Sequence, residues 1–255
     1  MTPFGIDHTE LDHIGSHIER FAGRDGRDGR DGQDGRDGQD GRKGRAVRVL
    51  ITGPARGAGV SALAWALAQR AVLEGKRVLF LDLDPLMPFT QRVLALGLAR
   101  EPVAAGQAIT RPWRVPGRDL EIACVTTAWS RLSSRGAASD QLAAELDHLS
   151  DSHDLIIADA APIAARRSTG ALDGCAMGPH FDLTFVAVQA GATTSEKLRT
   201  ALARHAEMGG NIAGIMLNER DFERPLEGLL RRARLVAARW PWTVRLLGLR
   251  PRTGF

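Results

Sequence analysis

Tyrosine is absent from this sequence of 255 residues, and cysteine occurs only twice, as Cys124 and Cys175. Two widely separated cysteines supply neither a disulfide framework nor a metal-binding pair, which fits a reducing compartment. No run approaches the roughly 20 apolar residues that a membrane-spanning helix needs. The first 21 residues carry early acidic side chains and no apolar core, so we expect no secretory signal peptide. The sequence therefore predicts a cytoplasmic protein.

Basic charge is concentrated near the end of the sequence. The net charge of the chain is +4, yet residues 225–255 contain seven arginines against one acidic residue, Glu227. Trp240 and Trp242 lie among these arginines, a mixture that suits the headgroup region of an anionic membrane. A final helix packed on its own domain, with a solvated arginine face, explains the pattern equally well. Nucleic acid would also attract such a patch, but no base-reading module accompanies it, so we do not expect that partner.

The first 45 residues divide into two segments that precede the main domain. Residues 8–21 place Leu11, Ile14, Ile18 and Phe21 at helical spacing, which predicts a short amphipathic helix in a segment spanning 1–22. We expect this helix to dock on its own domain rather than on a partner.

Glycine then recurs at every third position from Gly23 to Gly44, eight times in all. This period is typical of a collagen triple helix, but the run has no proline and alternates basic with acidic residues. These features favour a solvated linker over residues 23–45.

Short apolar strands alternate with helical segments from about Ala46 onward. The expected strands cover 46–52, 77–84, 120–126, 154–159, 182–189 and 211–218. The expected helices cover 61–75, 137–149, 194–208 and 225–238. Near-continuous apolar strands that alternate with helices indicate an α/β fold with a doubly wound, mostly parallel sheet covered by helices on both faces. We assign this domain to residues 46–224 and treat 225–255 as a separate basic segment.

A glycine-rich turn joins the first expected strand to the first expected helix of this domain. It reads GPARGAGVS from Gly53 to Ser61, and such a turn exposes backbone N–H groups that can bind phosphate. The P-loop pattern G-x-x-x-x-G-K-S/T is matched by Gly59 and Ser61. The first glycine comes one position early, and Val60 occupies the lysine position. Alone, the turn is a weak match to this pattern, and an ordinary strand-to-helix connection explains it better.

Aspartates follow two of the other apolar strands. Asp82 and Asp84 come at the end of the second strand, and Asp159 ends the strand over 154–159. Because parallel strands bring their carboxyl ends to one edge, these aspartates should lie beside the glycine turn. P-loop proteins hold Mg²⁺ and its waters in this way. Each aspartate could alternatively cap the helix that follows it, but the combination favours a nucleotide site.

Together these motifs resemble the deviant Walker, MinD/ParA-like superfamily, and within it the bacterial tyrosine kinases of capsule and exopolysaccharide synthesis. That family has T-S-x-x-P-G-E-G-K-S at the loop, where this chain has residues 52–61. Its I-D-x-D-x-R-x-P corresponds to LDLDPLMP over 81–88, and its Y-D-x-V-I-I-D-T-P-P corresponds to HDLIIADAAP over 153–162. The longest similar stretch runs over 181–221, and the resemblance covers about Ala46 to Asp221.

The resemblance implies a role for each site residue. ATP or ADP with Mg²⁺ would be the cofactor; Ser61 would bind the metal directly, and Asp82 and Asp159 would hold it and its waters. Asp82 and Asp84 would act in phosphoryl transfer, and Asn218 would contact adenine. The remaining predicted nucleotide contacts lie in the loop: Gly53, Arg56, Gly57, Ala58, Gly59, Val60 and Ser61.

The departures from the family pattern concern catalysis. Val60 replaces the P-loop lysine, Leu86 stands at a family arginine, and Ala55 occupies the MinD/ParA signature lysine, although Arg56 could supply a charge. Tyrosine autophosphorylation is excluded, because the chain has no tyrosine. The resemblance, with these departures, thus implies a kinase-like, nucleotide-binding regulator of exopolysaccharide production, located peripherally at the inner membrane. Its expected partner is an integral-membrane polysaccharide co-polymerase or export protein, and a homo-oligomer stays open. An active ATPase or kinase and an adaptor that binds no nucleotide are the alternatives.

Overall fold

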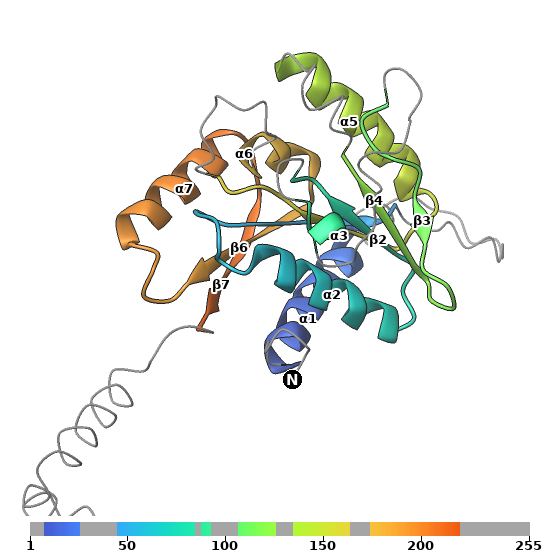
Figure 1. The fold of residues 1–255 in the computed structure, drawn as a ribbon, viewed down its shortest axis with the longest axis horizontal. Coiled ribbons are helices and arrows are strands. Elements are labelled where there is room, and N and C mark those ends of the chain that lie inside the picture. Colours follow the sequence, from blue (N-terminus) through green and yellow to red (C-terminus); the bar gives the residue numbers. More distant parts are fainter. Residues whose placement is uncertain are drawn as a thin grey trace, which may run out of the picture. The chain divides into compact units, whose positions relative to one another are not determined.

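Seven strands form one sheet with helices on both faces (Figure 1). The computed structural model describes the following residues: 8–25, 45–84, 88–92, 107–125, 135–163 and 174–219. The strands are β1 (Val47–Thr52), β2 (Val78–Asp82), β3 (Trp113–Arg114), β4 (Leu120–Cys124), β5 (Leu155–Asp159), β6 (Leu183–Gln189) and β7 (Ile212–Asn218). The helices are α1 (His8–Asp25), α2 (Val60–Leu73), α3 (Phe89–Arg92), α5 (Arg135–Ser150), α6 (Gly174–Met177), the 3₁₀-helix η3 (Gly178–His180) and α7 (Ser195–Glu207).

The order of the strands is β3-β4-β2-β5-β1-β6-β7. All neighbours pair in parallel except β3, which runs antiparallel to β4 at one edge. The six expected strands are all present, and the doubly wound, mostly parallel α/β architecture is confirmed. Strand β3 was not predicted, because a segment of two exposed residues is too short to show a periodic pattern.

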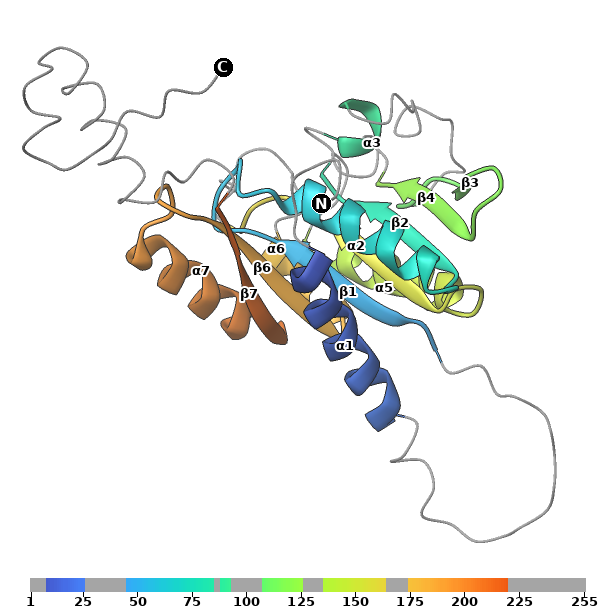
Figure 2. The same cartoon turned by 90° about the horizontal axis from the view of Figure 1, so that it is seen from below.

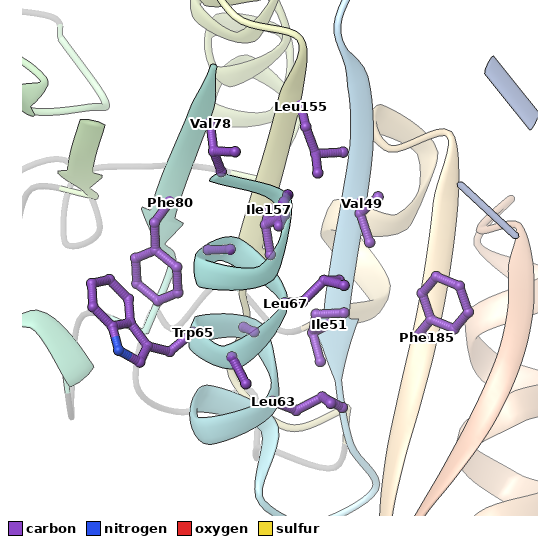
Figure 3. Packing of buried hydrophobic residues seen from close by; sticks show 14 of the residues in the cluster. Val49, Ile51, Leu63, Trp65, Leu67, Val78, Phe80, Leu155, Ile157 and Phe185 are labelled. Atoms are coloured by element: carbon purple, nitrogen blue, oxygen red, sulfur yellow. The ribbon is translucent and has the colours of Figure 1, made fainter. Parts of the chain in front are cut away.

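Each face of the sheet carries its own layer of helices. Successive side chains of a strand point to opposite faces, so Val49 and Ile51 of β1 pack with α2 while Leu50 packs toward α5. Figure 3 shows the first of these layers, in which Trp65 of α2 lies against Phe80 of β2. Their ring planes are nearly perpendicular, with centroids 5.3 Å apart. Because both faces are covered, the central strands consist mainly of apolar residues.

Helix α1 docks on the same face as α2, as the sequence predicted (Figure 2). Leu11, Ile14 and Ile18 are 1%, 5% and 3% exposed and belong to the core beneath α2. Two ion pairs with the end of α2 and the turn after it flank this contact, Asp12 with Arg70 at 2.9 Å and Glu19 with Lys76 at 3.0 Å. The helix extends to Asp25, beyond the expected end at Phe21.

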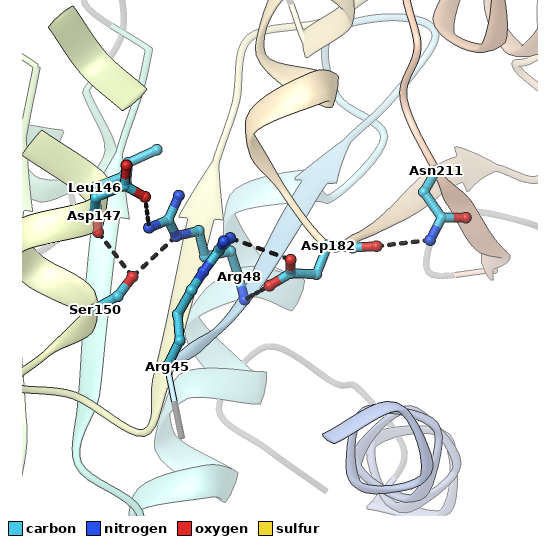
Figure 4. A network of polar contacts seen from close by, with 7 residues as sticks. All are labelled: Arg45, Arg48, Leu146, Asp147, Ser150, Asp182 and Asn211. Carbon is cyan, nitrogen blue, oxygen red and sulfur yellow. Dashed lines mark hydrogen bonds and ion pairs between the residues drawn. The ribbon is translucent and has the colours of Figure 1, made fainter. Parts of the chain in front are cut away.

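A buried arginine connects the start of β1, at the end of the strand opposite the glycine turn, to α5 and to Asp182 (Figure 4). Arg48 is 3% exposed; its guanidinium donates to Ser150 and forms an ion pair with Asp147 of α5. Its backbone N–H donates to Asp182, 2.7 Å away, at the start of β6. These contacts hold the strand that carries the glycine turn.

The compact unit that contains these elements ends at Asn218. The glycine run beyond Asp25, Leu86, the helix expected over 225–238 and the basic segment 225–255 lie outside the described residues. Among the helices that the structure describes, none has the length and apolar character required to cross a bilayer.

Candidate functional site

The candidate site lies where the connections of the sheet diverge. β1 is flanked by β5 and β6, and the chain leaves β1 toward α2 on one face. After β5, α6 packs on the opposite face through Met177. In open α/β sheets, ligands bind in the crevice outside the carboxyl ends of the strands at such a point. The turn after β1 and the aspartates after β2 and β5 all lie at this edge.

The glycine turn has a backbone that only glycine adopts readily. Gly57 and Gly59 have φ angles of +85° and +90°, and Gly59 directly precedes α2. Among the residues that the structure describes, no side chain caps this end of α2. The first N–H groups of a helix have no intrahelical partner and favour an anion. The turn therefore offers backbone donors to a phosphate group.

Asn218, at the end of β7, supports the turn from the side. Its amide Nδ2 donates to the carbonyl of Ala58 over 3.1 Å. A Cβ atom added to Gly59 would lie 2.3 Å from this Nδ2, so a side chain there would displace the asparagine. The adenine contact expected of Asn218 stays a prediction, and the structure adds a contact with the loop that the sequence did not indicate.

Val60, at the position of the P-loop lysine, packs into the protein. It is half-buried against the core cluster beneath α2. Its Cγ2 would lie 3.1 Å from a Cβ on Gly53, and that Cβ would also lie 2.8 Å from the carbonyl oxygen of Ala187. An apolar side chain thus packs beneath the loop at the position where the P-loop pattern has a lysine.

Asp82 is a buried carboxylate with a fixed orientation. It is 1% exposed; Oδ2 accepts from the backbone and the hydroxyl of Thr90, both at 2.9 Å, and Oδ1 accepts from Asp84 N at 3.2 Å. Burial raises its pKa from 3.8 to about 6, although these hydrogen bonds act in the opposite direction. Asp82 and Asp159, which is 2% exposed, are direct neighbours across β2 and β5.

Asp84 and Arg56 join the strand end to the glycine turn. Arg56 Nη1 lies 3.3 Å from Asp84 Oδ2, and the arginine side chain is half exposed while the aspartate is largely buried. The turn after β5 is tied to the same loop, because Ile163 N donates to Gly53 O over 2.9 Å. The predicted loop and the three aspartates are therefore gathered at one edge of the sheet. Ser61, the second residue of α2, is half-buried beside the loop.

These residues can bind a polyphosphate, and they supply some of the ligands that Mg²⁺ needs. The glycine turn fits a phosphate, since its close packing and positive φ angles keep side chains out of the cradle. Within the part of the chain that the structure describes, no group of three or more His, Cys, Asp or Glu side chains forms a metal site by itself. Mg²⁺ typically uses one or two carboxylates together with phosphate oxygens and water. Asp82 and Asp159 with the Ser61 hydroxyl match that donor set, provided a nucleotide supplies the remaining oxygens.

Sequence reasoning missed Thr90 as the residue that orients Asp82. Thr90 is fully buried in α3, a helix of four residues. A segment of this length shows no periodicity, and nothing in its composition marks a contact with a residue eight positions earlier. The contact arises from tertiary packing of Phe89 against Trp65 and Phe80.

No protein-family model and no curated protein matches the sequence. Solved structures do resemble the fold. The kinase domain of the Escherichia coli tyrosine kinase ETK is 20% identical, with 68% of this chain and 67% of that chain covered and a TM-score of 0.51. The VpsO kinase domain is 18% identical over 70% of this chain and 87% of that chain, with a TM-score of 0.53.

A third structure of the same fold is a Cyanothece McdA variant in complex with ATP. It is 18% identical over 67% of this chain and 69% of that chain, with a TM-score of 0.50. Identities of this size show the fold and nothing finer. The chain therefore has the doubly wound α/β fold of these two kinase domains and of McdA, as the sequence motifs implied.

Proposed function

We propose that this chain is a kinase-like P-loop protein of exopolysaccharide or capsule biosynthesis and export, which binds ATP or ADP with Mg²⁺ and regulates a membrane partner. The observation that supports nucleotide binding is the gathering of the glycine turn with Asp82, Asp84 and Asp159 at one strand edge. The process and the partner, an integral-membrane co-polymerase or export protein, rest on the family resemblance of the motifs. An association with the inner membrane belongs to the same proposal.

In this proposal the backbone N–H groups from Gly57 to Ser61 bind the phosphates. The Ser61 hydroxyl and the carboxylates of Asp82 and Asp159 hold Mg²⁺ and its waters, and the metal would neutralise phosphate charge. Thr90 fixes the Asp82 carboxylate through two hydrogen bonds of 2.9 Å. Asn218 holds the loop through Ala58 O.

Two features support impaired catalysis. Val60 packs against the core, so no lysine from this position reaches the transferring phosphate. The chain also contains no tyrosine to receive a phosphate. Binding without efficient transfer suits a protein that regulates a partner according to the nucleotide it holds.

Binding of fluorescent N-methylanthraniloyl-ADP with Mg²⁺ tests the nucleotide site. Gly59→Ala forces an unfavourable φ of +90° and a contact with Asn218, so binding should weaken at least tenfold. Gly75→Ala is the matched control. Gly75 also has a positive φ, +81°, but has no atom within 4 Å of an added Cβ and lies beyond the other end of α2.

The control variant should bind like the wild type, and EDTA should abolish binding to all three proteins. No binding by the wild type at millimolar nucleotide would refute the proposed site and favour a structural adaptor. Equal loss in both variants would show that the effect comes from stability rather than from the loop.

The contact between Arg56 and Asp84 favours one alternative, an active ATPase or kinase in which Arg56 replaces the missing lysine. Measured phosphate release distinguishes this function from a regulator that only binds. A rate abolished by both Asp82→Ala and Arg56→Ala would establish the alternative, whereas a wild-type rate equal to the buffer rate would exclude it.

A further inference from the structure

A cavity adjoins the glycine turn on the side of α7. It has a volume of about 780 Å³ and lies between the first half of the turn, the residues after β5 and one face of α7. The backbone donors from Gly57 to Ser61, the carboxylates of Asp82 and Asp159, and Asn218 do not line it. The cavity is therefore separate from the phosphate cradle, and Arg56 is the one predicted site residue in its wall.

Positive charge dominates the polar lining of this cavity. Among the described residues that line it, Arg56, Lys197 and Arg204 contribute three cations against one acidic residue, Glu196. Lys197, Thr200 and Arg204 follow one another at helical spacing, so α7 presents them on the same face. Arg204 Nη1 donates to the carbonyl of Ile163 over 2.8 Å, which fixes one wall of the cavity to the other.

Of the three cations, Lys197 has its charge neutralised least by other side chains of the protein. Among the described residues, no carboxylate lies within 4.0 Å of its ammonium group, whereas Arg56 pairs with Asp84. Thr194 accepts a hydrogen bond from Lys197 N at 3.3 Å and so fixes the backbone of the first turn of α7. An exposed lysine at the mouth of a concave surface can bind an anion without first breaking an ion pair.

The rest of the lining is apolar or small. Pro54, Ala55, Pro162, Ile163 and Ala201 provide uncharged surface between the cations. Small-molecule sites commonly enclose about 300–1,000 Å³ and combine apolar walls with a few convergent polar groups. The volume and the lining of this cavity have that character.

We infer that this cavity binds a small organic anion, with a phosphate, sulfonate or carboxylate group at Lys197 and Arg204 and an uncharged body against the proline-rich wall. This site goes beyond the proposed nucleotide site and does not depend on it. Arg56 adjoins both sites through its contact with Asp84.

Binding of 8-anilinonaphthalene-1-sulfonate to the full chain, without nucleotide, tests the inference. This probe carries one sulfonate on an aromatic body, and its fluorescence increases when it leaves water. Lys197→Glu should weaken binding at least tenfold. Thr200→Trp should abolish saturable binding, because Thr200 is exposed on α7 and a tryptophan there would fill the cavity.

Arg199→Glu is the matched control, since Arg199 is exposed on the same helix but does not line the cavity. Its affinity should stay within twofold of the wild type, and circular dichroism should show that all three variants fold. Equal weakening by Lys197→Glu and Arg199→Glu would mean that only overall charge matters. Unchanged binding in either Lys197→Glu or Thr200→Trp would place the probe elsewhere. Either result overturns the inference.

Discussion

The buried carboxylate of Asp82 should make the free energy of unfolding depend on pH. The substitution Asp82→Asn should remove this contribution. Asp82 is 1% exposed and lies beside Asp159 in the sheet. Burial raises its pKa to about 6, against 3.8 for an exposed carboxyl. Asn has nearly the same shape and can accept the two hydrogen bonds from Thr90 through its carbonyl oxygen.

The sign of the effect follows from the proton balance. Well below pH 3.8, Asp82 is protonated in both the folded and the unfolded chain, so its burial carries no charge penalty. Between about pH 4 and 6 the folded protein holds this proton more tightly, and the free energy of unfolding falls as the pH rises. Above pH 6 the full penalty applies. The interval from 3.8 to about 6 corresponds to about 3 kcal/mol.

Urea denaturation in EDTA, at pH values from 4 to 7.5, measures how the free energy of unfolding changes with pH. Groups distant from residue 82 titrate alike in the two proteins, so the free energy of unfolding of Asp82→Asn minus that of the wild type reports Asp82 together with its electrostatic interaction with Asp84. This difference should increase by about 2 kcal/mol between pH 4 and 7.5, because part of the penalty already applies at pH 4. Asp151→Asn, which removes an exposed carboxyl instead of a buried one, is the matched control. A difference that is constant or decreases with pH for Asp82→Asn would refute the argument.

Two further predictions concern packing and are checked by chemical denaturation. Leu11→Ala removes a side chain that is 1% exposed and should cost about 2–5 kcal/mol. The control Leu73→Ala, at a side chain that is 79% exposed, should change stability by less than about 0.5 kcal/mol. Gly210→Ala places a Cβ 2.1 Å from Nε2 of the buried His205 and should lower the free energy of unfolding by about 1–3 kcal/mol. Gly15→Ala, within α1 and 4.0 Å from its nearest neighbour, should instead stabilise by about 0.5–1 kcal/mol. Equal effects within either pair would contradict the packing described.

The central sheet could be predicted from the sequence because its strands are buried on both faces. β5 reads Leu-Ile-Ile-Ala before Asp159, and all five of its residues are buried. Parallel pairing then places the ends of such strands side by side, and Asp82 indeed faces Asp159. The glycine turn was predictable for a related reason, since the positive φ angles of Gly57 and Gly59 suit few other residues.

The contacts that organise the site could not be predicted, because they join short segments distant in the sequence. Thr90 reaches Asp82 from a helix of four residues, and Asn218 reaches Ala58 across 160 positions. The cavity beside α7 was missed as well. Lys197 and Arg204 belong to an ordinary polar helix face, and only the folded chain brings them opposite Arg56.

The loss of the lysine at Val60 changes the electrostatics of the whole strand edge. Among the residues that the structure describes, three aspartates lie there with one guanidinium, and that guanidinium is already engaged by Asp84. A polyphosphate bound by the loop amides would therefore meet two further carboxylates, Asp82 and Asp159, with no cation from these described residues between them. Coulomb repulsion at such a buried edge is strong, so phosphate binding should depend on Mg²⁺ to separate the charges. Val60 also packs with Gly53 and the core, which makes the missing cation a feature of how the loop folds.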